Sequence, residues 1–245
     1  MTTRPREGLT RSDEGPPTLI GCSHGTDSPA GRAAVRSILA GVRVARPDLD
    51  VREAFVDVQV PTVADVVRDA TQAGGSAVVV PLLLSTGFHV GVDIAAAVAG
   101  RRAASAGALG PDDRLVHILV DRLREAGAAP GDAIVCAAAG STDPRAAVAV
   151  AAVVDGLRAA WADGPVTIGY GSAALPRVPD AIAEAHRAGP VRVVVAAYLL
   201  APGFFHSRLL GSGAGVVTGP LAPDPRLVQI VLDRYAEAAR QLPSA

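Results

Sequence analysis

The sequence has few cysteines, few aromatic residues, no lysine and no long apolar run. Cys22 and Cys136 are its only cysteines, too few for a four-thiolate zinc site, an iron–sulfur cluster or a disulfide framework, so we expect a reducing cytoplasm. No apolar run reaches the roughly 20 residues of a membrane span, and the N-terminus lacks the apolar segment of a signal peptide. Basic residues number 23 against 24 acidic ones, which argues against nucleic-acid or membrane-surface partners.

Apolar residues, in contrast, are plentiful. Of the 245 residues, 49% are hydrophobic, which is enough to build the core of one large domain or of two smaller ones. The first 16 residues are polar and charged, and we expect them to form a disordered tail.

The sequence contains an internal repeat. Segment 109–126 returns as segment 221–238 with 11 of 18 positions identical. Weaker matches pair 19–25 with 134–140, 61–67 with 176–182, and 83–88 with 199–204. The repeat predicts two copies of one unit, with a boundary near 127–132 and lobes at 17–129 and 130–245.

Each unit alternates short apolar runs with amphipathic stretches of helical length. In the first unit we predict strands at 18–22, 51–55 and 76–84, helices at 29–45 and 62–73, and a closing helix at 112–124. The run at 76–84 is apolar without alternation, which is typical of a strand buried on both faces of a parallel sheet. A fourth strand is predicted weakly near 102–106 and more clearly at 216–219. The expected fold is α/β, with two similar parallel-sheet βαβ lobes and a cleft between them.

Polar side chains follow the three main strands of the first unit. His24 follows the first strand, Asp57 the second and His89 the third. Because parallel strands end at one edge of a sheet, these residues are expected to converge there. Two imidazoles and a carboxylate suit a divalent transition metal, and the same groups accept protons near neutral pH. A hydrogen-bonded loop histidine or a helix-capping Asp is the alternative for each residue alone.

The second unit has lost this set. The positions of His24, Asp57 and His89 correspond to Ala139, Ser172 and Phe205. The reactive site is therefore expected in the first unit.

Several other residues remain candidates. His206, after the third strand of the second unit, is a candidate ligand or substrate contact, with an ordinary loop histidine as the alternative. Arg32, in the helix after the His24 loop, is a candidate contact for an anionic substrate or a surface arginine. His117, beside the apolar stripe of its helix, is expected to be a surface or packing residue rather than a ligand, and His186 is expected to be solvated. Segment 211–215 is glycine-rich but lacks the context of a nucleotide-binding loop.

At the level of motifs, the chain resembles the sirohydrochlorin chelatase family, the ferrochelatases and cobaltochelatases of sirohaem and cobalamin synthesis. The resemblance rests on LIGCSHGTDSPAGR, FVDVQVPTV and VVVPLLLSTGFHVGVDI, and it extends over about residues 18–240. His24 matches the family's HG motif, and His89 matches its G-x-H motif. Asp57 stands where the family often has Glu, which keeps the carboxylate but shortens its reach.

The resemblance implies a metal-insertion enzyme. Sirohydrochlorin and a divalent metal ion are then its partners, with Fe²⁺ preferred to Co²⁺ and no permanently bound cofactor. His24 and His89 present the metal and accept the pyrrole protons, and Asp57 is a supporting carboxylate. Ser85, Thr86, Gly87, Phe88, His206 and Arg32 are candidate contacts for the carboxylates of the tetrapyrrole. A monomer and a homodimer are both compatible with the duplicated chain. A non-catalytic tetrapyrrole or metal carrier is the competing interpretation, and a partner-binding module that has lost activity is a third.

Overall fold

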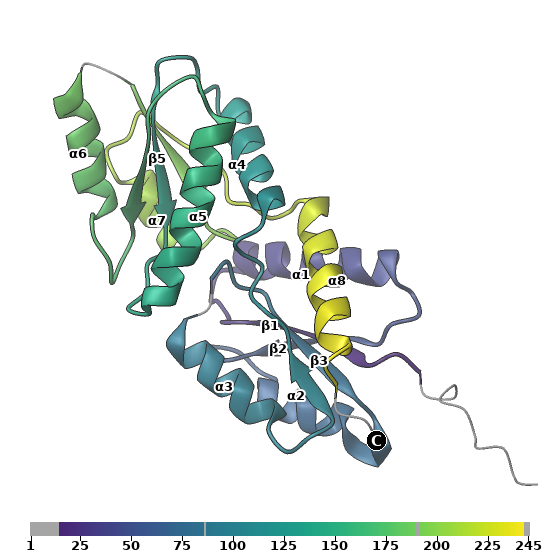
Figure 1. The fold of residues 1–245 in the computed structure, drawn as a ribbon. Coiled ribbons are helices and arrows are strands. Elements are labelled where there is room, and N and C mark those ends of the chain that lie inside the picture. The colour runs from purple at the N-terminus through teal and green to yellow at the C-terminus, as the bar shows by residue number, and fades with distance from the viewer. Residues whose placement is uncertain (1–14, 86, 190–191, 243–245) are drawn as a thin grey trace, which may run out of the picture.

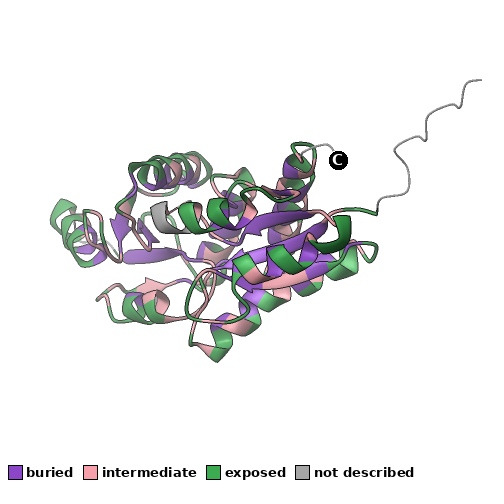
Figure 2. Ribbon diagram, turned by 90° about the horizontal axis from the view of Figure 1, so that it is seen from below, coloured by how far each residue is buried: buried purple, intermediate pink, exposed green. Residues whose placement is uncertain are grey.

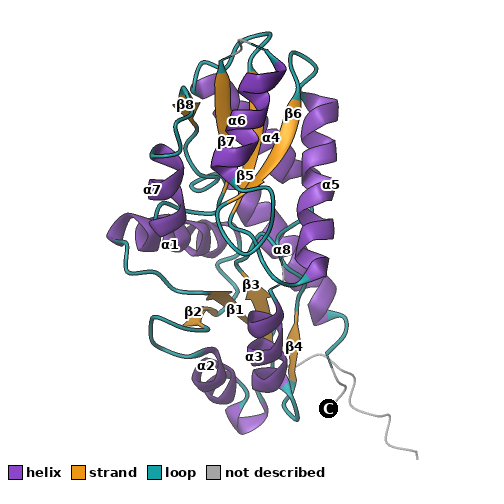
Figure 3. Ribbon diagram, turned by 90° about the vertical axis from the view of Figure 1, so that its left-hand side faces the viewer, coloured by secondary structure: helices purple, strands orange, loops and turns teal. Residues whose placement is uncertain are grey.

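The structure, a computed structural model, describes residues 15–85, 87–189 and 192–242, which form two parallel sheets with helices on both faces (Figures 1 and 3). Most of the predicted tail, residues 1–14, and Thr86 lie outside the described residues. Within the described ranges, no helix is both long and apolar enough to cross a membrane.

The first sheet and its helices form what we call lobe 1. Its four parallel strands run in the order β2-β1-β3-β4. They are β1 (Thr18–Ser23), β2 (Val51–Phe55), β3 (Ala77–Pro81) and β4 (Ala103–Ser105). Helix α1 (Pro29–Ala45) packs on one face, and α2 (Val63–Ala70) and α3 (Phe88–Val98) pack on the other. Every residue of β1 and β3 is buried (Figure 2), as the run without alternation predicts.

Lobe 2 repeats this arrangement. Its strands run in the order β6-β5-β7-β8, all parallel. They are β5 (Ala133–Ala138), β6 (Val166–Tyr170), β7 (Val193–Tyr198) and β8 (Val216–Val217). Its helices are α5 (Pro144–Ala160), α6 (Val178–Ala188) and α7 (Phe204–Leu210). The matching strand orders confirm the predicted α/β fold of two similar parallel-sheet lobes.

The two closing helices are exchanged between the lobes. Helix α4 (Asp113–Glu125) follows lobe 1 in the chain but packs against α5 and β7 of lobe 2. Helix α8 (Pro225–Ala239) follows lobe 2 but packs against α1 and β3 of lobe 1 (Figure 1). One cluster of buried side chains therefore joins both lobes, including Leu39, Leu119 and Ile230. The boundary near 129 stays a prediction about the repeat, since packing does not follow the order of the chain there.

Three elements end two or more residues before their predicted end. Helix α2 ends at Ala70, whereas the prediction extended it to residue 73. After Ala70 the Thr71 hydroxyl donates to the Val67 carbonyl at 2.8 Å, and a short 3₁₀ turn, Gln72–Gly74, follows. Strand β3 ends at Pro81, because the next three leucines leave the sheet and line a cavity instead. The fourth strand of the second unit, predicted to be the clearer one, is the shorter, with 2 residues against 3 in β4.

Candidate functional site

Two adjoining cavities lie between the lobes, where the carboxyl ends of both sheets meet. Their volumes are about 320 and 420 Å³. Both are lined by His24, Leu82, Leu83, Leu199, Leu200 and Phe205. Residues from both lobes therefore form one continuous cleft, which is the predicted position of the site.

Close contacts hold the lobes together beside this cleft. The Tyr198 hydroxyl of lobe 2 donates to the Leu84 carbonyl of lobe 1 at 3.2 Å. Burial raises the pKa of Tyr198, which keeps this donor protonated. Gly31 of α1 lies so near lobe 2 that a Cβ atom there would be 2.5 Å from the Pro202 carbonyl oxygen. The cleft is thus bounded by fixed backbone on both sides.

The segments that follow the strands of lobe 1 converge as predicted. The Asp57 backbone N–H donates to the His24 carbonyl at 3.2 Å, and the Leu82 N–H donates to the Cys22 carbonyl at 2.7 Å. Gly25 is required in this packing, because its φ is +94° and a Cβ atom would lie 2.5 Å from the Asp57 carbonyl oxygen. The backbone therefore brings the loops after β1, β2 and β3 to one edge.

His24 is the polar side chain common to both cavities. It is exposed, and among the described residues its ring makes no hydrogen bond. Cys22, two residues before it, is no competing metal ligand, because burial raises the pKa of its thiol to about 12. The imidazole of His24 is accordingly free to contact a ligand in the cleft.

Asp57 lies beside His24 along the backbone, but its side chain lines neither cavity. Its Oδ1 atom accepts a hydrogen bond from the Val58 N–H at 2.7 Å. Val58 has a φ of +58°, an unusual conformation for a β-branched residue, and this bond helps to hold it. Within the described part of the chain, no three His, Cys, Asp or Glu residues are grouped to hold a metal ion.

The loop after β3 leads into α3. Ser85 and Gly87 line the smaller cavity, and Gly87 is the N-cap residue of α3 with no side-chain cap. His89 lies in the first turn of α3, two residues after Gly87. The side chains of Phe88 and His89 lie outside the described residues, as does Thr86.

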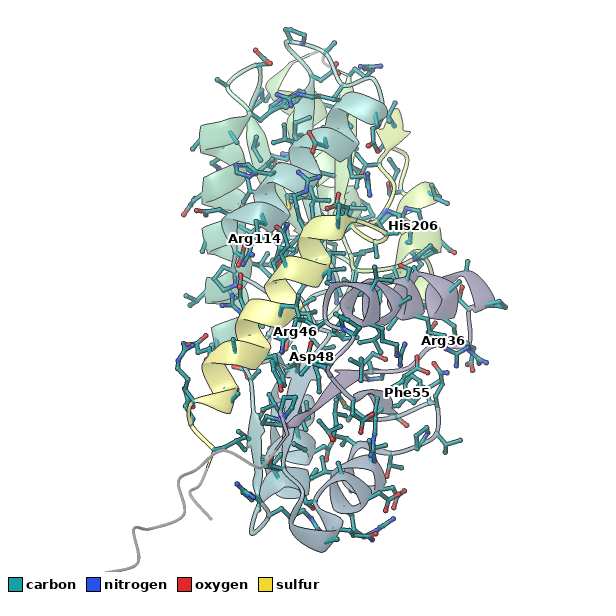
Figure 4. The ribbon with its side chains drawn as sticks, turned by 90° about the vertical axis from the view of Figure 1, so that its right-hand side faces the viewer. Arg36, Arg46, Asp48, Phe55, Arg114 and His206 are labelled. Atoms are coloured by element: carbon teal, nitrogen blue, oxygen red, sulfur yellow. The ribbon has the colours of Figure 1, made fainter. Side chains whose placement is uncertain are left out.

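His206 reaches the cleft from lobe 2. It lies on α7 (Figure 4). It lines the larger cavity together with His24. Its Nε2 atom is 3.0 Å from the Thr218 carbonyl oxygen. A carbonyl only accepts hydrogen bonds, so Nε2 carries a proton and donates it. Nδ1 is then the ring nitrogen left for a ligand. This is the usual arrangement for a ligand-binding histidine, because the hydrogen bond at one ring nitrogen orients the ring and leaves the other nitrogen free.

Arg32 contacts the loop that follows His24. Its Nε donates to the Thr26 carbonyl at 2.8 Å, and its guanidinium lies 3.7 Å from the Asp27 carboxylate. It is not among the residues that line either cavity, so it holds the loop that carries His24. His117 and His186 are exposed and line neither cavity, in agreement with the expectation for them.

Sequence reasoning missed the apolar wall that lobe 2 contributes. Ala138, Ala139, Val150 and Tyr170 line the smaller cavity opposite His24. It also missed Gln59, whose Oε1 accepts from the Thr26 N–H at 2.9 Å and ties two loops together. The repeat of 83–88 at 199–204 was a usable signal for Leu199 and Leu200, because it placed them at the equivalent edge of the second sheet.

The chain is similar to known proteins over most of its length. The model of the CbiX family matches residues 18–126 and 133–238. No curated protein sequence matches the chain. The structure is similar to SirB from Bacillus subtilis with Fe³⁺, with a TM-score of 0.75, 19% identity, and coverage of 91% of this chain and 96% of that one.

Two further structures share the fold. A cobalt complex of the sirohydrochlorin chelatase SirB from Bacillus subtilis subspecies spizizenii has a TM-score of 0.74 at 19% identity, covering 92% of this chain and 96% of that one. A multi-domain protein from Deinococcus radiodurans with structural similarity to chelatases has a TM-score of 0.67 at 18% identity, covering 91% of this chain and 56% of that one. At these identities the likeness concerns the fold.

Proposed function

The chain belongs to the CbiX family, and from that membership we propose that it is a sirohydrochlorin chelatase, which inserts a divalent metal ion into the tetrapyrrole. The observation that carries the proposal is the position of His24, on the shared wall of two adjoining cavities that both lobes line. The family membership and the fold shared with SirB support it.

The walls of the cleft suit a large planar ligand. Aliphatic side chains of both lobes, such as Leu82, Val150 and Leu199, supply apolar surface for the faces of a macrocycle. Polar side chains are few, with His24 and Ser85 on the lobe 1 wall and Ser141, Tyr170 and Tyr198 on the lobe 2 wall. Such a site holds a tetrapyrrole mainly by its faces and leaves its centre accessible to a metal ion.

Metal insertion requires a loosely held ion and acceptors for two pyrrole N–H protons. We assign His24 and His89 to present the ion and to take up the protons, since imidazole does both near neutral pH. Asp57 supports them: Oδ1 holds its own loop, and Oδ2, which has no hydrogen-bond partner among the described residues, is the atom available to the ion. Because the protein supplies only a few ligands, some coordination positions of the ion stay open, and the ion can pass on to the macrocycle.

The carboxylates of the substrate need donors at the edge of the cleft. Backbone N–H groups around Gly87, at the start of α3, are suitable because the helix end has no side-chain cap. Ser85 adds a hydroxyl on the same wall. We assign Thr86 and Phe88 to this loop as well, and His206 to the opposite side, with Nδ1 facing the ligand.

Fe²⁺ is our first choice of metal and Co²⁺ the second. Imidazole and carboxylate ligands accept both ions, and structures of SirB contain Fe³⁺ or cobalt. The choice of iron follows from the wider need for sirohaem. Parallel metallation assays with each ion decide between them.

The experiment is a spectrophotometric metallation assay with sirohydrochlorin and Fe²⁺ or Co²⁺. The protein is expected to accelerate the visible spectral change, and His24→Ala and His89→Ala are expected to lower kcat about 100-fold. His117→Ala is the matched control, because His117 is exposed on α4 and lines neither cavity.

Two results would decide against the proposal. Rates that stay at the wild-type level in both histidine variants would remove the assigned residues from the mechanism. Tight binding of one sirohydrochlorin without any acceleration would identify the protein as a tetrapyrrole carrier instead.

A further inference from the structure

A third cavity, separate from the two cavities of the cleft, lies in lobe 2. It has a volume of about 380 Å³ and is bounded by the end of β6, the start of α6 and the end of α7. In lobe 1 the equivalent helices α2 and α3 pack directly against each other. In lobe 2 helix α7 has 7 residues where α3 has 11, and the cavity occupies the space beside its end.

Two arginines line this cavity. Within the described ranges, neither Arg177 nor Arg208 forms an ion pair, although many arginines of the chain pair with a carboxylate, as Arg187 does with Glu184. Asp180, in the first turn of α6, makes no ion pair with Arg177 among the described residues. The Arg208 guanidinium lies over the Phe204 ring, 5.7 Å from the ring centroid. One face of the guanidinium is therefore held against the ring, and the N–H groups of Arg208 stay available for a ligand. The cavity therefore carries two uncompensated positive charges.

The two lobes differ at the start of the helix that borders this cavity. In lobe 1 the N-cap residue of α2 is Thr62, whose hydroxyl accepts from the Asp65 N–H at 3.2 Å. In lobe 2 the N-cap residue of α6 is Arg177, which makes no side-chain cap. A hydroxyl acceptor has thus been replaced by a cation at a helix end that already favours negative charge. An anion from outside the chain would supply the missing acceptor.

An independent feature of the same cavity also requires an acceptor. Ser212 lines it, and the Oγ atom of Ser212 is buried with no hydrogen-bond partner among the described residues. A buried hydroxyl without a partner is uncommon in a folded protein, and a ligand atom beside it would complete its hydrogen bonds. Ser172 also lines the cavity, but its hydroxyl already donates to the Ala139 carbonyl at 2.9 Å.

We propose that this cavity binds an oxyanion of the carboxylate or phosphate class, held by Arg177, Arg208 and the hydroxyl of Ser212. Guanidinium groups bind carboxylates and phosphates through two parallel hydrogen bonds to two oxygens of the same group, which favours these oxyanions over a simple anion such as chloride. Tyr170 lines both this cavity and the cleft. A carboxylate arm of the tetrapyrrole is therefore one source of the oxyanion, an assignment that rests on the proposed function, and free inorganic phosphate is the other.

The first experiment uses inorganic phosphate and no tetrapyrrole. The Tm of the full chain is measured in phosphate and in chloride at matched ionic strength, because added salt alone screens charges. Phosphate at ten times its Kd is expected to raise the Tm by about 3 °C. Arg177→Thr and Arg208→Gln are expected to abolish this rise. Arg177→Thr also gives α6 the kind of hydroxyl cap that α2 has in lobe 1. The Tm of this variant in chloride should therefore be no lower than that of the parent chain.

The matched control is Arg187→Gln, which removes an arginine from the same helix outside the cavity and should keep the phosphate effect. The second experiment measures kcat and KM for sirohydrochlorin in the same variants. A tenfold rise in KM with kcat unchanged would identify the substrate's carboxylate as the occupant. Unchanged KM together with loss of the phosphate effect would identify a free anion.

The proposal is overturned if Arg177→Thr and Arg208→Gln change neither the phosphate effect nor KM. The phosphate measurement and the kinetic measurement also allow the oxyanion site to be tested separately from the proposed function. A chain that fails to metallate sirohydrochlorin but loses its phosphate stabilisation with Arg177 would retain the oxyanion site and lose only the chelatase assignment.

Discussion

Arg114 on α4 (Figure 4) forms an ion pair with Asp233 on α8, with 2.6 Å between guanidinium nitrogen and carboxylate oxygen. The equivalent pair of the repeat, Arg226 on α8 and Asp121 on α4, is formed at 2.8 Å. The two exchanged helices thus make reciprocal contacts across a pseudo-twofold relationship. Each helix covers the sheet of the other lobe, so the cleft between the lobes is fixed by packing on both of its outer sides.

A second reciprocal contact predicts where stability is concentrated. Arg122 of α4 donates to the carbonyls of Pro220, Leu221 and Pro223, which precede α8. Arg234 of α8 donates to those of Ala108, Leu109 and Pro111, which precede α4. We expect Arg122→Met and Arg234→Met each to lower the free energy of unfolding by about 2 kcal/mol, because several carbonyls lose a charged donor. Urea denaturation measures the change.

The control for this prediction lies on the same helix. Arg124 is largely exposed, and its nearest carboxylate, on Asp121, is 3.5 Å away. Arg124→Met should change the free energy of unfolding by less than about 0.5 kcal/mol. Equal effects at positions 122 and 124 would contradict the assigned role of the exchanged-helix contacts.

The carboxylate at the start of α4 predicts a pH dependence of stability. Hydrogen bonds from the Arg114 side chain hold the pKa of Asp112 below its usual range. A depressed folded-state pKa stabilises the protein above the unfolded-state pKa, which is about 3.9, and this stabilisation is lost as the pH falls through the folded-state value. Asp112→Asn keeps the helix cap but should remove this part of the acid sensitivity. Urea midpoints at neutral and acid pH test it, with Asp113→Asn as the control.

Gly25 predicts a tight steric requirement next to His24. Gly25→Ala would place a Cβ atom against the Asp57 carbonyl and would force alanine into positive φ, at a cost of about 1–3 kcal/mol. We expect lower thermal stability together with a loss of metallation, because the His24 loop must shift. Gly107→Ala is the matched change: a Cβ atom there has nothing within 4 Å, and Gly107 lines neither cavity of the cleft. An equally harmful Gly107→Ala would mean that steric fit at Gly25 is not the cause.

Asp57 allows its two roles to be separated. Asp57→Asn keeps an oxygen that accepts from the Val58 N–H but removes the negative charge, whereas Asp57→Ala removes both. If the carboxylate supports the metal, Asp57→Asn should raise KM for the metal ion about tenfold without changing the Tm. Wild-type kinetics in Asp57→Asn, with a loss only in Asp57→Ala, would restrict this residue to holding its loop.

Much of the fold and part of the site follow from local patterns. The buried strands, the repeat and the position of His24 at a strand end could be predicted, because burial on both faces of a parallel sheet leaves a plain apolar signal and strand ends share one edge. The end of β3 could not be predicted, since Leu82 and its neighbours are apolar for the cleft rather than for the sheet. The Asp57 hydrogen bond to the next N–H depends on a positive φ at Val58 that composition does not show.

The amino-acid sequence by itself determined two α/β units with parallel sheets, and it placed the candidate histidine at the edge that became the cleft. Only the tertiary structure decided which sheet each closing helix covers. Leu115 and Leu119 on α4 correspond to Leu227 and Val231 on α8, so both helices present almost the same apolar stripe and either sheet could bury it. The choice is made by long-range packing and by the reciprocal arginine contacts, which no local stretch of the chain encodes.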